Sequence, residues 1–493
     1  MQPKNLAFGG GAAQSAVNPF VLLIVLILGV LILTKPRDKA ISLFLFPAML
    51  IPMIDQVLVL GGVHFPMIRV LLLFGIARMI RAKATGESVI FTGGMTRLDK
   101  TVILFMLVTF VNGLLLWRDT GYLVKELGEI YTVFGTYFLM RYLIRDNDDS
   151  EKAIRALFYI AVIVAAIMTY EQATGRNPYA LLGGAKADFY GALLVREDRL
   201  RAVAGFGHAL LAGTFGAIVM PLFVSLWLKD KKNLKLAATG LIACAIIVWA
   251  SASSTPMLAY AGGLMALCMW PLRELMRPIR WGIVITLVTL HMVMKSPVWQ
   301  LIDRMSIVGG SSGYHRYQLV DQCIRHFSDW WLYGVKDTGA WGWDMWDTAN
   351  QYVSIADSTG LLPFILFIAI LTYGFKYVVA ARKAAVGNKN MQLYYWALGC
   401  ALFANAIGFF GISYWDQTMV VWYTFLAIIG AAYLTVSATA SVPAVSTATA
   451  PAQTPAPALI SPPRPAYVPK ASTATSYGRM ITGRFSPRST TTK

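Results

Sequence analysis

Four arginines lie in two polar stretches that separate strongly apolar parts of this chain. Arg199 and Arg201 come shortly before an apolar run that begins near residue 206, and Arg316 and Arg325 lie in the second polar stretch. A guanidinium group stays charged and presents a planar fork of donors that matches phosphate oxygens. Each charge-assisted hydrogen bond contributes about 1.5–3 kcal/mol. These side chains predict a phosphate site, with snorkelling towards lipid headgroups as the alternative.

Two histidines accompany these arginines and could take part in proton transfer. His315 directly precedes Arg316, and His208 follows Arg201 at the start of the apolar run. A histidine changes its charge near neutral pH, so it can accept a proton from an attacking hydroxyl group. We expect His315 to act as the base, or else to be a polar loop residue. His208 is expected either to contact the substrate or to pack within its helix.

Polar side chains crowd the stretch TANQYVSIADSTGLL, which immediately precedes an apolar segment. Asn350, Gln351 and Tyr352 in this stretch could hydrogen-bond sugar hydroxyls. Upstream, Trp343 could stack on a sugar ring or lie in an interfacial aromatic belt. Asp344 could act as a base or cap a helix, but carboxylates without a nearby His cluster make a weak metal signal. We predict no metal and no cofactor.

The composition indicates that membrane helices position these side chains. Hydrophobic residues make up 57% of the 493 residues and charged residues 14%, whereas soluble domains are about 45–50% apolar and about 25% charged. A spanning helix needs about 20 mostly apolar residues. We therefore predict an all-α, polytopic membrane bundle of about 12–13 transmembrane helices, with candidates at residues 18–34, 40–55, 66–81, 101–117, 122–142, 154–171, 206–228, 235–251, 255–272, 281–296, 357–377, 391–410 and 418–436.

The net charge of +18 reflects membrane topology rather than nucleic-acid binding. Most of the 43 Lys and Arg residues lie in alternate connections and in the C-terminal tail, and positive residues mark the cytoplasmic side of a membrane. Two long connections, 172–205 and 297–356, are thereby predicted on the outer face. The arginines described above lie in these connections or at their edge, where a lipid-linked phosphate is the natural ligand.

The second outer connection contains a helical pattern, because an apolar stripe recurs at three- and four-residue steps with polar residues opposite. We expect one helix lying along the membrane surface. Arg316 lies near its N-terminus, where backbone amides also favour an anion. The stripe consists of Leu319, Val320, Cys323, Ile324, Phe327 and Trp331.

The C-terminal residues 437–493 are rich in Ala, Pro, Thr and Ser. Such a segment buries too little apolar surface to offset its ordering entropy, so we predict a disordered cytoplasmic tail. Residues 1–436 are predicted to form the transmembrane domain. Three of the four cysteines lie inside apolar stretches, which leaves no disulfide framework.

Three stretches resemble the bacterial O-antigen ligase and polymerase superfamily, which comprises membrane enzymes that move glycans off polyprenyl diphosphate. The run RAVAGFGHALLAG, beginning at Arg201, resembles the family's pattern of an Arg followed by Gly, an aromatic residue and Gly-His entering a helix. Arg316, followed by an amphipathic helix and the Tyr-Gly-Val of 333–335, resembles a second family segment. Asn350 and Gly360 keep the spacing of the ligase motif.

Three places depart from the family pattern. Ala349 stands where the ligases have His, and Pro363 occupies the last position of the motif. Ser254, Thr255 and Pro256 stand where the family has Ser-Arg-Gly. The loss of the motif His favours a polymerase or an exopolysaccharide-assembling relative over a ligase, and an inactive relative is a further interpretation.

The resemblance implies a metal-independent glycosyltransferase with a GT-C-like helical arrangement in the bacterial inner membrane. Arg201 and Arg316 would stabilise the charge that grows on the leaving diphosphate, and His315 would accept the proton. The expected partners are a polyprenyl-diphosphate-linked glycan, membrane lipids and other polysaccharide-assembly proteins. The residues expected to contact the substrate are Arg199, His208, Arg325, Trp343, Asp344, Asn350, Gln351 and Tyr352.

Three other functions are consistent with parts of the sequence. An O-antigen ligase would transfer the glycan to a lipid acceptor. A transporter or flippase of lipid-linked sugars could use the same arginines, although such proteins usually carry ionisable residues near the bilayer midplane. A cytoplasmic transferase could use Asp146 and Asp148 to bind a metal ion, but these residues also look like the ordinary start of a helix.

Overall fold

A computed structural model describes residues 15–53, 55–86, 91–184, 195–196, 198–305, 312–441 and residue 466. The chain divides into two units, Met1–Val442 and Pro443–Lys493. Almost all of the predicted tail, 437–493, lies outside the described residues. The last helix continues to Ser441, beyond the predicted end of the transmembrane domain at residue 436.

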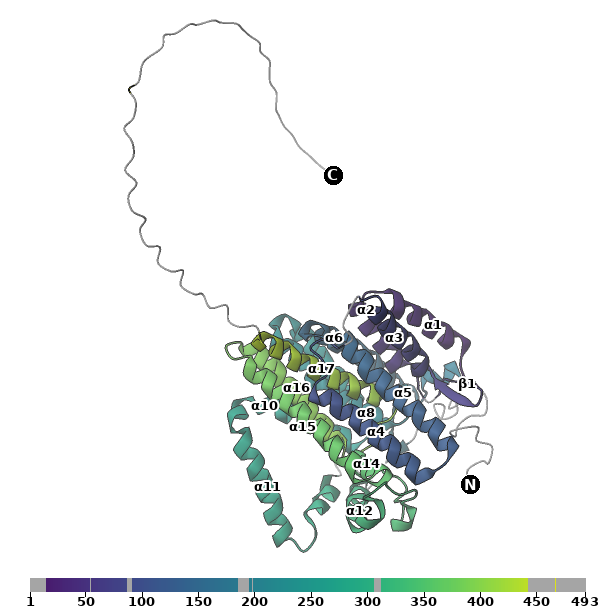
Figure 1. The fold of residues 1–493 in the computed structure, drawn as a ribbon. Helices are drawn as coiled ribbons and strands as arrows, with labels where there is room; N and C mark the ends of the chain where they lie inside the picture. Colours follow the sequence, from purple (N-terminus) through teal and green to yellow (C-terminus); the bar gives the residue numbers. More distant parts are fainter. Residues whose placement is uncertain are drawn as a thin grey trace. The chain divides into compact units, whose positions relative to one another are not determined.

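Helices dominate the first unit, as the sequence predicts (Figure 1). The α-helices are α1 (Pro19–Thr34), α2 (Arg37–Leu50), α3 (Met67–Ala84), α4 (Arg97–Trp117), α5 (Thr120–Leu143), α6 (Asn147–Thr174), α8 (Ala209–Lys229), α9 (Leu234–Ala250), α10 (Ser254–Cys268), α11 (Met276–Val293), α12 (Ser312–Arg325), α13 (Phe327–Trp330), α14 (Gln351–Thr359), α15 (Leu361–Ala384), α16 (Lys389–Gly408) and α17 (Gln417–Ser441).

Short elements complete the fold. Within the described residues, strands occur as two antiparallel hairpins, β1 (Val57–Leu60) with β2 (Val63–Pro66) and β3 (Val195–Arg196) with β4 (Arg199–Leu200). The 3₁₀ helices are η1 (Pro178–Leu182), η2 (Lys231–Asn233), η3 (Trp270–Leu275), η4 (Val298–Met305) and η5 (Gly339–Trp341).

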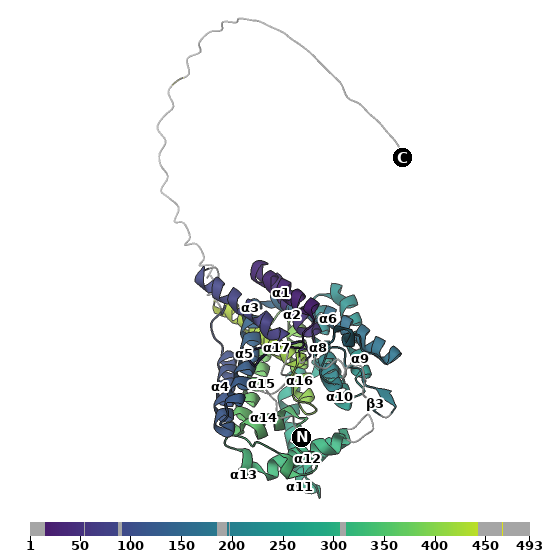
Figure 2. The same ribbon diagram turned by 90° about the vertical axis from the view of Figure 1, so that its right-hand side faces the viewer.

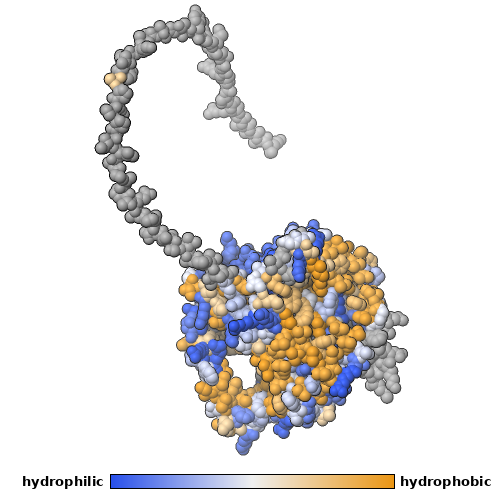
Figure 3. Space-filling model, in the orientation of Figure 1, coloured by the Kyte–Doolittle hydropathy of each residue, from blue (hydrophilic) through white to orange (hydrophobic). Residues whose placement is uncertain are grey.

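The helices form a multi-pass membrane bundle. Each of the thirteen predicted stretches overlaps at least one helix of the structure, and 357–377 overlaps both α14 and α15 (Figure 2). Six spans within the described residues are long and apolar enough to cross a membrane, or up to seven if a bent helix pair counts as one span. Apolar side chains cover much of the face seen in Figure 3, with polar patches towards its edges. The six spans are Arg97–Trp117, Asn147–Thr174, Ala209–Lys229, Lys231–Ala250, Leu361–Ala384 and Gln417–Ser437.

Helix α8 forms the centre of the bundle, because 94% of its apolar window is buried. It packs against α9, α10 and α16. A Cβ atom added at Gly213 would lie 2.4 Å from the Ser251 hydroxyl and 2.7 Å from the Pro256 ring. Glycine therefore permits α8 to approach the start of α10 closely.

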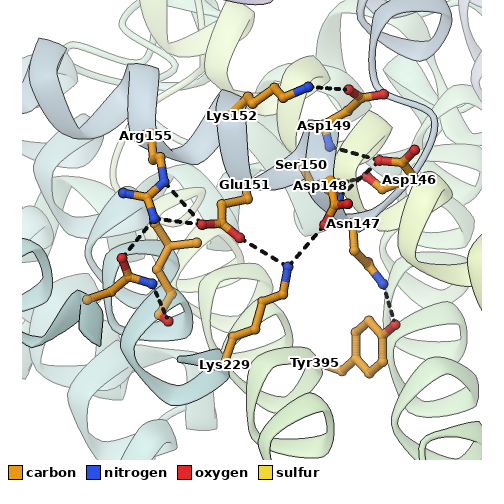
Figure 4. Close-up of polar contacts among 12 residues, drawn as sticks. Asp146, Asn147, Asp148, Asp149, Ser150, Glu151, Lys152, Arg155, Lys229 and Tyr395 are labelled. Carbon is orange, nitrogen blue, oxygen red and sulfur yellow. Dashed lines mark hydrogen bonds and ion pairs between the residues drawn. The ribbon is translucent and has the colours of Figure 1, made fainter. Parts of the chain in front are cut away.

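Ion pairs hold one end of the bundle together. Lys229 lies between Asp148 and Glu151, with its Nζ 3.5 and 3.0 Å from their carboxylate oxygens (Figure 4). Arg37 contacts the Asp149 carboxylate at 2.5 Å. Asp146 caps α6 by accepting hydrogen bonds from the backbone N–H groups of residues 148 and 149 at 3.0 and 2.8 Å. The Asp-x-Asp sequence is thus a helix start, which confirms the simpler interpretation.

Hydrogen bonds to backbone groups hold the opposite end together. The Gln56 amide donates to the Gly183 carbonyl at 2.9 Å, and Asn18 donates to the Leu182 carbonyl at 3.0 Å. Gln417 donates to the carbonyls of Gly205, at 2.8 Å, and Ile51, at 3.3 Å. Connections that the charge pattern assigns to opposite sides of the membrane therefore meet at opposite ends of the bundle.

The second outer connection differs from the single surface helix predicted for it. Helix α12 ends at Arg325, and α13 begins at Phe327 after a break at His326. Leu319 and Cys323 of the predicted stripe are buried, but Ile324, Phe327 and Trp331 are 45–49% exposed. Trp330 is buried instead, because its indole N–H donates to the Cys323 carbonyl at 2.7 Å and folds the chain back on α12.

A buried charge network joins α4 and α5. Arg141 is fully buried, and its Nε lies 3.3 Å from Oδ1 of Asp99. The Tyr137 hydroxyl donates to the same oxygen at 2.6 Å, while the other carboxylate oxygen of Asp99 accepts from the Thr96 backbone N–H at 2.7 Å. Removing one member of such a network leaves its partner's charge buried without compensation.

We expect Arg141→Met to lower the free energy of unfolding by about 3–5 kcal/mol, because the Asp99 carboxylate would lose its cation. Adding Asp99→Asn should restore part of the loss. Lys152→Met is a matched control, since Lys152 is 44% exposed and its ion pairs should contribute about 1 kcal/mol or less. Thermal unfolding of the purified proteins in detergent measures these effects, and equal losses for Arg141→Met and Lys152→Met would contradict the expectation.

Candidate functional site

Arg201 follows the β3–β4 hairpin at the backbone-bonded end of the bundle. Its Nη2 donates to the hydroxyl of Ser253 at 3.0 Å. Ser253 is buried and directly precedes α10. The next residue, Ala202, donates its backbone N–H to the Ala250 carbonyl at 3.0 Å. The guanidinium group is therefore positioned against the turn between α9 and α10.

Three side chains from other elements anchor the backbone that follows Arg201. The carboxylate of Glu171, on α6, accepts from the N–H groups of Val203 and Ala204, each at 2.7 Å. The amide of Asn177 donates to the Ala204 carbonyl at 2.7 Å. Asp416 accepts from the Gly207 N–H at 2.6 Å. The loop is thereby held at several points along its length.

His208 ends this anchored loop and caps α8. Its Nδ1 accepts a hydrogen bond from the Leu210 N–H at 3.1 Å. Burial, and secondarily the positive charge of Arg201, lowers the pKa of His208 from its ordinary value to about 4. The imidazole is consequently neutral at pH 7, with Nδ1 as acceptor and Nε2–H as the available donor. His208 can donate a hydrogen bond to a bound group but cannot readily take up a proton.

Arg199 stacks on a tryptophan at the edge of the same region. Its guanidinium carbon lies 4.2 Å from the centre of the Trp249 ring, and Nη2 lies 3.5 Å from the Trp249 carbonyl oxygen. Stacking leaves the edge of a guanidinium group able to donate hydrogen bonds. The aromatic support thus presents Arg199 beside the loop that carries Arg201.

A second cluster contains the other predicted catalytic residues. Arg316 is buried on α12, and its neighbour His315 donates from Nε2 to the Asp344 backbone carbonyl at 3.0 Å. The Asp344 carboxylate lies 3.9 Å from the same nitrogen. Partial removal from water raises the pKa of Asp347, the charges of His315 and Arg316 oppose that rise, and Asp344 adds to it. These groups therefore form one electrostatic cluster.

The polar side chains at the start of α14 mainly serve the fold. Asn350 is fully buried and caps α14 by accepting from the N–H groups of Tyr352 and Val353 at 3.0 and 3.2 Å. Gln351 accepts from the Tyr414 N–H at 2.5 Å, and the Tyr352 hydroxyl donates to the Ala406 carbonyl at 3.0 Å. One group remains for a ligand: the Asn350 Nδ2 is buried without a hydrogen-bond partner among the described residues.

The segment from the end of α16 to the first residue of α17, residues 409–417, joins the loop of Arg201 to the start of α14. Its Ser413 donates to the Thr348 carbonyl at 2.9 Å, next to Ala349, and Phe409 accepts from the Gln351 N–H at 2.8 Å. Asp416 and Gln417, in the same connection, hold the loop of Arg201. Two of the three stretches that carry the family resemblance, those that contain Arg201 and Asn350, thus attach to one short segment.

Two residues predicted to contact the substrate, Arg325 and Trp343, lie outside the two clusters. Arg325 is 66% exposed and pairs with Asp321 one turn earlier, at 2.6 Å. Asp321 is itself buried and also accepts a hydrogen bond from the Trp299 indole at 3.0 Å. Trp343 is 86% exposed. Within the part of the chain that the structure describes, neither Arg325 nor Trp343 forms a hydrogen bond or ion pair with the two clusters.

Sequence reasoning missed the residues that hold the site in place. Glu171 lies at the end of a predicted span, and Asp416 and Gln417 lie in a short connection between two spans. A carboxylate at the end of an apolar run could have signalled a buried polar contact. Among the described residues, no group of three or more His, Cys, Asp or Glu side chains could hold a metal ion.

Comparison with known protein families and with curated proteins gives no match to this sequence. The resemblance to the O-antigen ligase and polymerase superfamily therefore stays a prediction.

The lowered pKa of His208 predicts a specific pH dependence. The unfolded chain takes up this proton near pH 6.5, whereas the folded protein does so only near pH 4. The contribution of His208 is therefore complete above pH 6.5 and falls by at most about 3 kcal/mol between pH 6.5 and 4. His208→Asn should remove this loss, because Asn caps helices but does not titrate. Thermal unfolding of both proteins from pH 4 to 7 measures the difference, and parallel pH profiles would contradict the prediction.

Proposed function

We propose that this protein is a membrane glycosyltransferase that polymerises or transfers polyprenyl-diphosphate-linked glycans at the outer face of a bacterial inner membrane. The observation that carries the proposal is the position of Arg201, held by a loop whose backbone is bonded to Glu171 and Asp416. A preorganised cation stabilises charge that develops in the transition state without further reorganisation.

The proposed reaction breaks the bond between the anomeric carbon and the diphosphate oxygen. The hydroxyl group of the acceptor attacks the anomeric carbon, and the diphosphate leaves with the bonding electron pair. Arg201 and Arg316 would neutralise the growing charge, while the neutral His208 would donate from Nε2. His315 donates from Nε2 to the Asp344 carbonyl, so its Nδ1 would accept the proton of the acceptor.

The residues around Ala349 favour a polymerase over a ligase in this proposal. Ala349 has no group that could activate an acceptor, and the neighbouring Asn350 caps α14. His315 lies in the cluster that contains Arg316, beside Asp344. The proposed assignment therefore gives the role of base to His315, within a GT-C-like arrangement of helices.

Substitution of the two central arginines tests the proposal. Arg201→Ala and Arg316→Ala should each reduce transfer by about 10²–10³-fold, because each removes a donor from the developing charge. Arg325→Ala is the matched control and should keep most activity, since Arg325 is exposed and pairs within its own helix. The measurement is release of polyprenyl diphosphate from a lipid-linked oligosaccharide by the purified protein. Near-normal release by both alanine variants would exclude the mechanism.

The same assay separates transfer from transport. A transporter or flippase would move the lipid-linked oligosaccharide without liberating its carrier, so movement of the intact donor without release would favour transport. Labelling of engineered cysteines at the exposed positions 195 and 314, near Arg201 and Arg316 in the chain, tests the orientation. Both positions should react with an impermeant reagent added from outside, and protection of both would contradict an outer-face site.

A further inference from the structure

Helix α11 is attached to the bundle at its ends but not along its length. None of its 18 residues is buried, although most are apolar, and α10 and the segment that contains α11 are bent by 84°. Figure 1 shows α11 standing apart from α10 and α15, and Figure 3 shows an opening through the molecule beside it. The helix is about 27 Å long at 1.5 Å per residue, close to the thickness of a bilayer core.

Named contacts fix both ends of α11. At its C-terminal end, His291 stacks on Trp299 with ring centres 5.4 Å apart, and Trp299 donates to Asp321 on α12. Near its N-terminal end, Glu274 accepts from Arg382 of α15 at 3.2 Å, and Trp270 contacts Trp396 of α16 with ring centres 5.8 Å apart. The opening is therefore framed by the protein.

Both α11 and α15 carry exposed apolar side chains. On α11, Ile285 and Val288 are 61% and 59% exposed, and Leu362 and Ile365 of α15 are 52% and 51% exposed. A helix that is apolar on every face and unpacked belongs in contact with lipid. Exposing such surfaces to water costs about 25 cal/mol per Å² of apolar area. Acyl chains are therefore the suitable contents of the opening.

The N-terminal end of α11 is positively charged. A hollow of ≈350 Å³ is lined by Arg277, Arg280, Trp281 and Val284. Arg273 stacks on Trp270, and Glu274 pairs with Arg382 and Arg273. Among the described residues, no carboxylate forms an ion pair with Arg277 or Arg280. Two cations beside an indole and an aliphatic side chain suit a phosphate group joined to an acyl chain.

We propose that one anionic phospholipid of the cytoplasmic leaflet occupies this site, with its phosphate on Arg277 and Arg280 and its chains between α11 and the bundle. Because α11 is followed by η4 and then by α12, the lipid would support the element that carries Arg316. The lipid site itself does not rest on the proposed function, whereas the choice of a phospholipid over the lipid-linked substrate does.

The positions of Arg277 and Arg280 in the bundle identify which lipid suits the site. Arg382 lies near the C-terminal end of α15, shortly before α16 begins. In the first turns of α16, the Tyr395 hydroxyl accepts a hydrogen bond from Asn147 at 2.8 Å, at the end of the bundle that contains the ion pairs. Arg277 and Arg280 therefore lie at the end opposite to Arg201. A lipid-linked glycan bound at Arg201 would place its diphosphate at the other end, so a phospholipid of the leaflet is the suitable occupant.

Native mass spectrometry of the full chain in detergent tests the site. Phosphatidylglycerol and phosphatidylcholine are titrated separately, and the affinity of the first bound lipid is compared. The wild type should bind phosphatidylglycerol about tenfold more tightly than phosphatidylcholine, since each basic residue near the headgroup favours the anionic lipid. Arg277→Gln with Arg280→Gln should bring the ratio close to one.

Two further variants keep the test decisive. Lys383→Gln with Lys389→Gln removes two exposed charges near the same end without touching the lining of the hollow, so it should keep the tenfold ratio. Arg277→Lys with Arg280→Lys should also keep most of it and shows that the site tolerates substitution.

Three results would overturn the proposal. The first is an unchanged lipid ratio in the double glutamine variant. The second is a dimer that carries no lipid, because a second copy would then fill the opening. The third is displacement of phosphatidylglycerol from Arg277 and Arg280 by polyprenyl phosphate at equal concentration, which would assign the site to the substrate carrier.

Discussion

Backbone groups that are buried at the end of a membrane bundle must find hydrogen-bond partners inside the protein, because lipid offers none. Here one carboxylate, that of Glu171, satisfies two consecutive N–H groups of the loop after Arg201. Asp416 satisfies a third. The position of Arg201, the cap that His208 provides for α8, and the close approach of α8 to α10 all depend on this loop being fixed.

The sequence predicts where the helices lie along the chain. It does not predict which distant residues form hydrogen bonds with one another. Long apolar runs identify the membrane segments, since each run must be long enough to cross the bilayer. The bonds that Glu171 makes to Val203 and Ala204 join residues 32 and 33 positions apart, and the bond between Asp416 and Gly207 spans 209 positions. Periodicity is a local property, so it contains no information about contacts of this kind.

One local prediction was wrong for a physical reason, and the sugar contacts expected of Gln351 and Tyr352 stay a prediction. The apolar stripe after Arg316 continues past Arg325 at helical spacing, but the indole of Trp330 bonds to the Cys323 carbonyl and breaks the helix. Gln351 and Tyr352 have the polarity expected of sugar-binding residues, yet backbone partners occupy the Gln351 oxygen and the Tyr352 hydroxyl. A residue type indicates what bonds are available, whereas the fold determines where they are made.

Different kinds of bond hold the two ends of the bundle together, so the two ends respond differently to ionic strength. Charges such as Lys229, Glu151 and Arg155 hold one end, and they are partly exposed. Dissolved salt screens exposed charges over about 8–10 Å but has little effect on hydrogen bonds to backbone groups. High salt would therefore loosen the end with the ion pairs first, while the loop that carries Arg201 keeps its geometry.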